Sequence, residues 1–190
     1  MKKLTGAVFL ALILMTAAYY VSKIKSRKEK PSLEEVKEEA ESSQPQKKRE
    51  SIPAIDFDFQ DLNGRKYHLS DFKGKVIVLN FRRRECPACE YELAFLKNLY
   101  NRISGDENIM LIPLFLGEGS FVIADYLKGK NIKFSCYVDD YGLSAYKYRV
   151  YAVPTTFIID KHFQIVNRVV GVAEWDSEEI ISWLEKLSNE

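Results

Sequence analysis

A pair of cysteines lies where a buried strand is predicted to end and a helix to begin. Residues 75–81, KVIVLNF, form a largely apolar run, which is typical of a strand covered on both faces. The motif Cys86-Pro87-Ala88-Cys89 follows, and apolar residues then recur at helical spacing. Proline suits the first position of a helix because its missing N–H would have no partner there. The sequence therefore predicts a strand, a short loop and a helix that carries both sulfurs at its N-terminus.

This position predicts a reactive first cysteine. Unpaired N–H groups and the positive end of the helix dipole stabilise a thiolate, which is the nucleophile in disulfide exchange. We therefore predict that Cys86 attacks or is attacked. Cys89 lies one helical turn further on, and we expect it to face inward and act as the resolving thiol.

A metal clip and an inert disulfide are the other interpretations of the pair. A structural zinc site usually has four ligands, whereas the chain has no second cysteine pair and its histidines, His68 and His162, are isolated. An inert disulfide would close a very small loop and add little stability. Three cysteines are also too few for a disulfide framework. Redox chemistry is therefore favoured, and Cys136, on an apolar stretch, is interpreted as a buried free cysteine.

Strand and helix patterns alternate from Ile52 onward. Hairpins are predicted around Asn63-Gly64 and around residues 160–163. Further strands are expected at 109–116 and 134–138, and helices at 120–129, 142–148 and from Asp176, with Asp176 or Ser177 as a cap. The order predicts an α/β fold, with a mixed central sheet flanked by helices on both faces. A hydrophobic fraction of 46% is enough for a core, and the net charge of +1 gives no reason to expect nucleic acid as a partner.

The N-terminal part differs in composition. Lys2 and Lys3 precede an uncharged run of about 18 residues, which is near the lower limit for a membrane-spanning helix and long for a signal peptide. We interpret residues 1–22 as a membrane anchor (a signal anchor), residues 23–51 as a charged tether and residues 52–190 as the folded domain. A cleaved signal peptide and a buried core helix are the alternatives for the apolar run. Basic residues after it would, by the positive-inside rule, keep the domain in the cytoplasm.

The motifs together resemble the thioredoxin-like fold, and more closely the membrane-anchored thiol–disulfide oxidoreductases of the TlpA/ResA type. The resemblance covers residues 52–190 and rests on the order of DLNGRKYHLSDFKGKVIVLNF, CPAC, LGEGSFVIADYLKGKNIKFSCYVDD and YRVYAVPTTFIID. It implies a thioredoxin-like fold with an N-terminal hairpin extension and a central insert. It also implies exchange with protein thiols and disulfides, a membrane or soluble redox partner, and no cofactor besides the redox-active disulfide Cys86–Cys89. An extracytoplasmic domain (in the periplasm or at the cell exterior) and a role in cytochrome c maturation follow from the same resemblance, which overrides the charge asymmetry.

In such proteins the proline of VPTT is cis and faces the cysteine pair. Carried over, this is Pro154, preceded by Val153. The resemblance implies that the backbone of Val153 pairs with an incoming peptide strand beside the sulfur. The alternative is a plain proline that opens a strand.

The residue before the first cysteine departs from the family pattern. The family usually has tryptophan there, whereas this chain has Glu85. A carboxylate beside a thiolate tends to raise the thiol pKa, and Arg82, Arg83 and Arg84 would lower it if their side chains turn towards the sulfur. We therefore expect Glu85 and Arg84 to act on the pKa of Cys86 in opposite directions.

The proton acceptor for Cys89 is not evident from the pattern. Thioredoxin has a buried aspartate on the strand before the motif, where this chain has Asn80. Proteins of the ResA type place a glutamate between the cysteines, where this chain has Ala88. Candidates remain on and before the helix, each interpreted first as a solvated residue: Glu85, Glu90 and Glu92.

Two rival functions belong to other classes. A copper-handling module on the same fold would add a downstream histidine ligand, and neither His68 nor His162 lies at a matching position. A peroxidase-like protein on a related fold would need a threonine a few residues before its reactive cysteine, and residues 82–85 contain none. Copper titration and peroxide turnover would separate these functions from disulfide exchange.

Overall fold

The computed structural model describes residues 52–190. The predicted anchor at 1–22 and tether at 23–51 lie outside the described residues. Among the residues that the structure describes, no helix is both long enough and apolar enough to cross a bilayer.

One mixed sheet of eight strands forms the centre of the described part, in the order β1-β8-β7-β4-β5-β6-β2-β3. Strands β4, β5 and β6 run parallel, and the other neighbours pair antiparallel. Every residue of β4 is buried. The strands are β1 (Ile52–Pro53), β2 (Asp58–Asp61), β3 (Lys66–His68), β4 (Val76–Arg82), β5 (Ile109–Leu116), β6 (Tyr137–Asp139), β7 (Thr155–Ile159) and β8 (Gln164–Val170).

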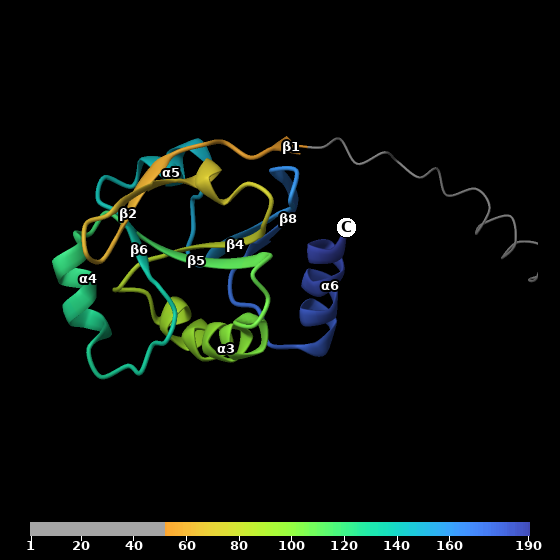
Figure 1. Cartoon of the computed structure of the whole chain (residues 1–190). Helices are drawn as coiled ribbons and strands as arrows, with labels where there is room; N and C mark the ends of the chain where they lie inside the picture. Colours follow the sequence, from red (N-terminus) through yellow and green to blue (C-terminus); the bar gives the residue numbers. More distant parts are fainter. Residues whose placement is uncertain (1–51) are drawn as a thin grey trace, which may run out of the picture. The chain divides into compact units, whose positions relative to one another are not determined.

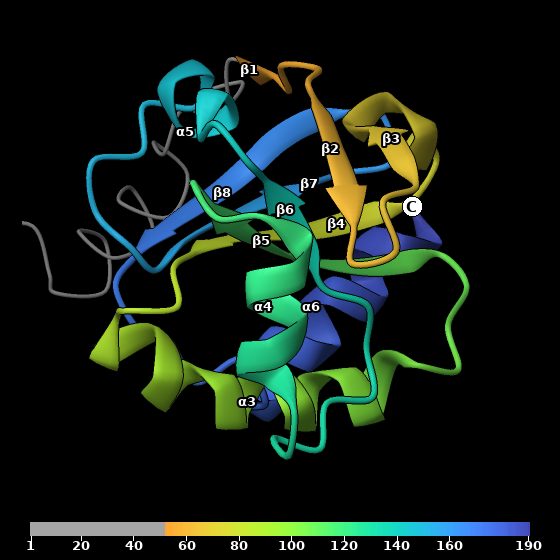
Figure 2. The ribbon, with the colours of Figure 1, turned by 90° about the vertical axis from the view of Figure 1, so that its left-hand side faces the viewer.

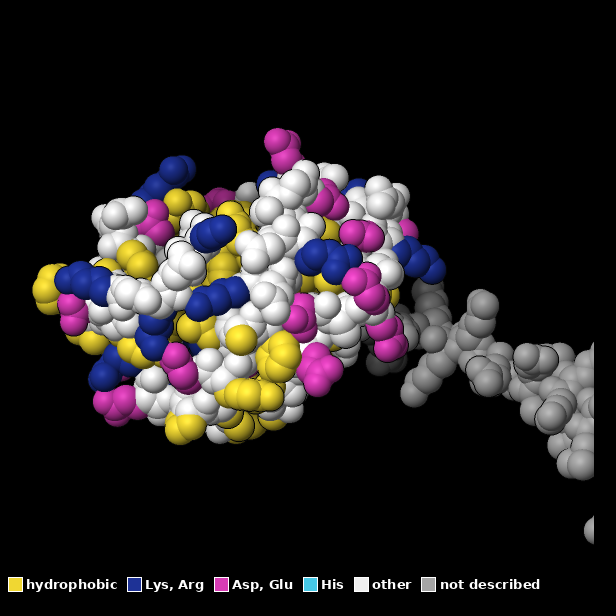
Figure 3. Space-filling view, turned by 90° about the horizontal axis from the view of Figure 1, so that it is seen from below, with side chains coloured by type: hydrophobic (Ala, Val, Ile, Leu, Met, Phe, Trp, Pro, Cys, Tyr) yellow, Lys and Arg dark blue, Asp and Glu magenta, His cyan; other side chains and the backbone are white. Residues whose placement is uncertain are grey.

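Helices cover both faces of the sheet (Figures 1 and 2). Helices α3 (Pro87–Ile103), α4 (Ser120–Leu127) and α6 (Glu178–Asn189) lie on one face. Helix α5 (Leu143–Lys147) and the 3-10 helix η1 (Leu69–Phe72) lie on the other face. Seen from below, basic and acidic side chains are intermixed on the surface, and hydrophobic side chains are visible in several places, with the largest group near the lower edge of the view (Figure 3).

Alternation along β4 divides the core into two clusters. Val76 and Val78 pack with the helices α3, α4 and α6, whereas Ile77, Leu79 and Phe81 pack on the opposite face. Successive side chains of a strand point to opposite faces, so residues 80 and 82 continue the row that faces α3. The second cluster is rich in aromatic rings, with centroids of Tyr148 and Phe157 5.0 Å apart.

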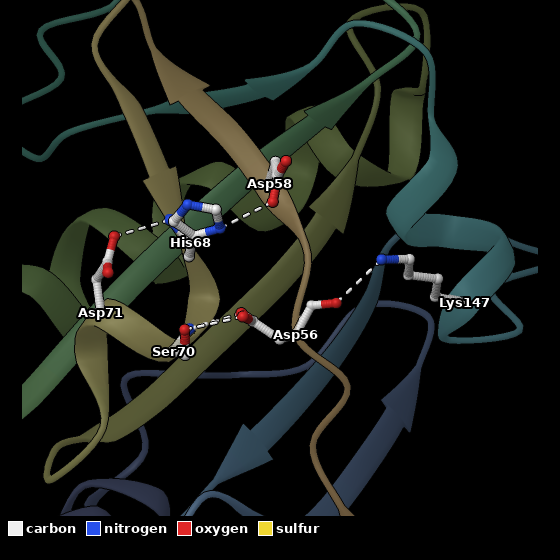
Figure 4. Close-up of polar contacts among 6 residues, drawn as sticks. All are labelled: Asp56, Asp58, His68, Ser70, Asp71 and Lys147. Carbon is white, nitrogen blue, oxygen red and sulfur yellow. Dashed lines mark hydrogen bonds and ion pairs between the residues drawn. The ribbon is translucent and has the colours of Figure 1, made fainter.

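Polar contacts attach the first hairpin to η1 and α5 (Figure 4). The carboxylate of Asp56 accepts hydrogen bonds from the backbone N–H and the hydroxyl of Ser70, at 2.8 and 2.9 Å. Lys147 donates to the backbone oxygen of Asp56 at 3.0 Å. His68 lies 2.8 Å from Asp58, so this imidazole is paired with a carboxylate on the neighbouring strand.

The structure confirms the predicted thioredoxin-like fold, both hairpins and the strand at 109–116. Ser177 caps α6, as one of the two expected residues. The strand expected at 134–138 is shorter and lies at Tyr137–Asp139. Strand β1 was not predicted, because a two-residue strand exists only through its pairing with β8 and has no local pattern. Helix η1 was not predicted either.

The hairpin turn gives a stability prediction. Gly64 has a φ of +81° and open space around its missing side chain, so replacement by alanine introduces only backbone strain. Gly64→Ala is expected to lower the free energy of unfolding by about 1–2 kcal/mol. Gly105→Ala is the control, since Gly105 also has open space but no left-handed φ. Urea unfolding midpoints test this, and equal midpoints for the two variants would contradict it.

Candidate active site

Cys86 and Cys89 lie at the start of α3 and are joined by a disulfide. Cys86 is the N-cap residue, with extended backbone (φ −141°, ψ 101°), and Pro87 occupies the first turn. The backbone N–H of Cys89 donates to the Cys86 sulfur at 3.1 Å. The predicted helix N-terminus is therefore confirmed, and one of its free N–H groups points at this sulfur.

The three cysteines differ in burial. Cys86 is partly exposed, Cys89 is fully buried and Cys136 is 3% exposed. Cys136 is free, as expected. Burial raises the pKa of the Cys136 thiol to about 12, although the charge of Arg82 acts in the opposite direction. At neutral pH this thiol is therefore uncharged and unreactive.

The loop before β7 brings the predicted proline to the cysteine pair. The Val153–Pro154 peptide bond is cis, as the resemblance implied. The carbonyl oxygen of Val153 lies 3.7 Å from the Cys86 sulfur. Thr155 closes the turn by donating to the carbonyl of Ala152 at 2.7 Å. Cys86, Cys89, Val153 and Pro154, which are far apart in the sequence, thus lie in one place.

The three arginines before the motif do not act as one group. Arg82 is fully buried, and its Nη2 donates to the carbonyl oxygen of Cys89 at 2.5 Å. Arg83 is exposed. Arg84 reaches the carboxylates of Glu85 and Glu118, at 2.7 and 3.1 Å. This division was not predicted, because it depends on where β4 ends: Arg82 is its last residue, and Arg83 and Arg84 follow it.

Arg84 and Glu85 pair with each other. The hydrogen bond to Glu118 is the main cause that raises the pKa of Arg84, and Glu85 contributes less. The side chain of Glu85 is 78% exposed. Because opposite charges in contact offset each other at a third site, we expect their combined influence on Cys86 to be smaller than the influence of either alone.

Glu92 is buried, so its interpretation as a solvated residue is wrong. Its side chain is fully covered, and its two oxygens accept hydrogen bonds from Trp175 Nε1 at 2.7 Å and Asn80 Nδ2 at 2.9 Å. Asn80 also donates to Thr156 Oγ1 at 2.8 Å. The sequence did contain an indication of this burial, since residue 92 recurs at helical spacing with residues 89, 93 and 96 and therefore shares a helix face with them.

Glu90 differs from Glu92. It is exposed and accepts hydrogen bonds from Lys130, at 2.7 Å, and from the hydroxyl of Tyr126. The hydrogen bond from Lys130 is the main reason that the pKa of Glu90 is lowered. Glu90 thus joins α3 to α4 at the surface, and Glu92 is the candidate carboxylate of the interior.

Trp175 has a part in the site that the sequence did not predict. It lies in the segment before α6, is 1% exposed and donates to Glu92. Burial of a tryptophan usually requires a hydrogen-bond acceptor for its N–H. A lone tryptophan between two elements carries no sequence pattern, so only the tertiary structure shows this contact.

Several proteins with known names are similar to this chain. "Thiol-disulfide oxidoreductase ResA" of Bacillus thuringiensis subsp. konkukian is 31% identical over 135 residues, which cover 71% of this chain and 76% of the relative. The ResA of Bacillus subtilis is 29% identical over 122 residues, which cover 64% and 68%. The pneumococcal exposed lipoprotein thioredoxin of Streptococcus pneumoniae has a similar structure, with a TM-score of 0.59, 25% identity and coverage of 70% and 100%. StoA from Bacillus subtilis shares the fold, with a TM-score of 0.58, 21% identity and coverage of 70% and 98%.

The fold and the cysteine pair define an enzyme class, the thiol–disulfide oxidoreductases of thioredoxin-like fold. The relatives in this class are named for acting on thiols and disulfides. More particularly, the chain belongs to the AhpC/TSA family, whose profile matches residues 51–168.

Differences in burial predict a difference in thiol reactivity. In the reduced, folded protein, Cys86 is expected to alkylate more than roughly tenfold faster than Cys89 or Cys136, because only Cys86 combines exposure with a helix N-terminus. Brief iodoacetamide treatment followed by mass-spectrometric mapping measures the three rates. Equal labelling of Cys86 and Cys89 would refute the division of roles.

Proposed function

We propose that Cys86 is the nucleophile and Cys89 the resolving thiol of an extracytoplasmic oxidoreductase that reduces protein disulfides. The observation that carries this proposal is the environment of the Cys86 sulfur. It is partly exposed, it accepts the N–H of Cys89, and it lies 3.7 Å from the Val153 carbonyl. A sulfur in this position is both accessible and stabilised as a thiolate.

The reaction starts from the reduced pair. The Cys86 thiolate bonds to one sulfur of the substrate disulfide, and the other substrate sulfur leaves as a thiolate. Cys89 then loses its proton and bonds to the sulfur of Cys86, which breaks the mixed disulfide. The substrate gains the electron pair and is released as two thiolates, which take up protons from the solvent, while the Cys89 proton passes to its acceptor. The enzyme pair becomes the disulfide found in the structure. A membrane or soluble thiol partner would reduce the pair again.

Val153 and Pro154 are proposed to shape the substrate-docking surface. Val153 is half-buried and Pro154 is buried. The carbonyl of Pro154 accepts the N–H of Gly171 at 2.8 Å, so this loop is fixed to the end of β8. An extended peptide segment pairing with the backbone of Val153 would bring its disulfide next to Cys86.

Glu92 is the proposed proton acceptor for Cys89. Both side chains are fully buried, and they lie one turn apart on α3. A buried carboxylate requires hydrogen bonds, and Asn80 and Trp175 supply them. Asn80 itself cannot take a proton in this role, so the carboxylate of the interior comes from the helix instead of the strand.

The wider setting of the reaction is also a proposal. Residues 1–22 would anchor the protein in a membrane, with residues 52–190 on the extracytoplasmic side. Cytochrome c maturation is the proposed process, because apocytochrome cysteines must be reduced before haem attachment. The similarity to proteins named ResA supports the extracytoplasmic side and the proposed process, whereas the anchor is proposed from the apolar run in the sequence.

Cysteine variants test the chemistry. Cys86→Ser is expected to abolish reduction of insulin disulfides. Cys89→Ser is expected to accumulate a mixed disulfide on Cys86, because the resolving thiol is missing. Cys136→Ser is the control and should retain activity. Non-reducing gels and mass spectrometry detect the adduct, and its appearance on Cys89 in Cys86→Ser instead would reverse the assignment.

Topology is tested separately. A reporter that is active only outside the cytoplasm, fused after Glu190, is expected to be active. The matched fusion carries a reporter that is active only in the cytoplasm. Activity of this second fusion alone would show that the basic residues after the apolar run decide the orientation.

A further inference from the structure

Arg82 lies under the cysteine pair with no exposed surface. It is at the end of β4, on the strand face that α3 covers. Arginine stays protonated in proteins, and a buried charge is strongly unfavourable unless other groups compensate it. The contacts of this guanidinium therefore need an explanation.

Two contacts hold the guanidinium in place. Nη2 donates to the carbonyl oxygen of Cys89 at 2.5 Å. Nη1 donates to Asn80 Oδ1 at 3.4 Å, a long hydrogen bond. The guanidinium carbon also lies 5.3 Å from the centre of the Phe115 ring. Within the described residues, Nε has no hydrogen-bond partner, so one donor of this side chain remains unused when the pair is oxidised.

Asn80 links Arg82 to Glu92. Its amide oxygen faces the cation and its amide nitrogen donates to the carboxylate at 2.9 Å. The charge of Glu92 is the main factor that opposes the lowering of the Arg82 pKa by burial. Other titratable groups around Arg82 lie on several elements and act in the same direction: Glu90 on α3, Tyr126 on α4, and Cys136 before β6.

We propose that Arg82 is a positioning residue for disulfide exchange: it holds the Cys89 carbonyl and balances the Glu92 carboxylate beneath the cysteine pair. With both charges present, the buried cluster is neutral overall. The thiolate that forms during exchange then lies above a neutral cluster and not beside a lone negative charge. This inference rests on the proposed function, because it assigns Arg82 to the site where exchange takes place.

Charge variants of the reduced full-length protein test the inference through the thiolate absorbance titration. Arg82→Met removes the cation and is expected to raise the titration midpoint by roughly one pKa unit, whereas Glu92→Gln should lower it by a similar amount. The double variant removes both charges and should return to within a few tenths of a unit of the wild-type midpoint. Arg82→Lys keeps the charge, so its titration midpoint should lie close to the wild-type midpoint. Arg83→Met is the control, since Arg83 is exposed, and should leave the midpoint unchanged.

The double variant also serves as a control in case a single variant does not fold. It leaves no lone buried charge, so it is expected to fold even where Arg82→Met alone does not. Comparison of the double variant with Glu92→Gln isolates the charge of Arg82, and the double variant must have the higher midpoint. Equal midpoints for these two proteins, or a loss of thermal stability without any midpoint shift, would overturn the inference. A wild-type protein that titrates normally but does not reduce insulin would count against the proposed function instead.

Discussion

Burial of two opposite charges beneath the cysteine pair is the constraint on which the site depends. Removing one ion from water costs several kcal/mol even after relaxation, so Arg82 and Glu92 need partners in fixed positions. Asn80, Trp175 and the Cys89 carbonyl provide them. These groups come from β4, α3 and the segment before α6. A shift of any one element would leave a buried charge without its hydrogen bond.

The same contacts set the orientation of α3. Because the Cys89 carbonyl is bound by Arg82 and Glu92 is bound by Asn80 and Trp175, this side of the helix faces the sheet. The N-cap residue, Cys86, then lies at the edge of the core and remains partly exposed. Different accessibility of the two sulfurs is therefore a consequence of how the buried charges are arranged.

Local patterns were sufficient for most of the fold. The apolar runs predicted β4 and β5, the motif with Pro87 predicted the start of α3, and Asn63-Gly64 predicted the first hairpin. The position of Pro154 opposite the cysteines came from the family resemblance, since no local rule joins residues so far apart. Short elements such as β1 depend on a partner strand and carry no pattern of their own.

The buried charges could not be predicted with the same rules. Three arginines before the motif and a glutamate after it suggest a solvated surface, because Arg and Glu are rarely buried unless paired. Strand alternation would have placed residues 80 and 82 on the face of Val76 and Val78. What it could not show is that α3 supplies the matching carboxylate, because this contact depends on how the helix packs on the sheet.

Asparagine at position 80 is consistent with this charge arrangement. An aspartate there would put a second carboxylate next to Glu92, and neighbouring carboxylates oppose each other's ionisation. Asparagine avoids this repulsion and still offers an acceptor to Arg82 and donors to Glu92 and Thr156. The interior therefore keeps one carboxylate, carried by α3, and one cation, carried by β4. The asparagine at position 80 and the arginine at position 82 are thus parts of one arrangement, in which each residue lowers the energetic cost of burying the other.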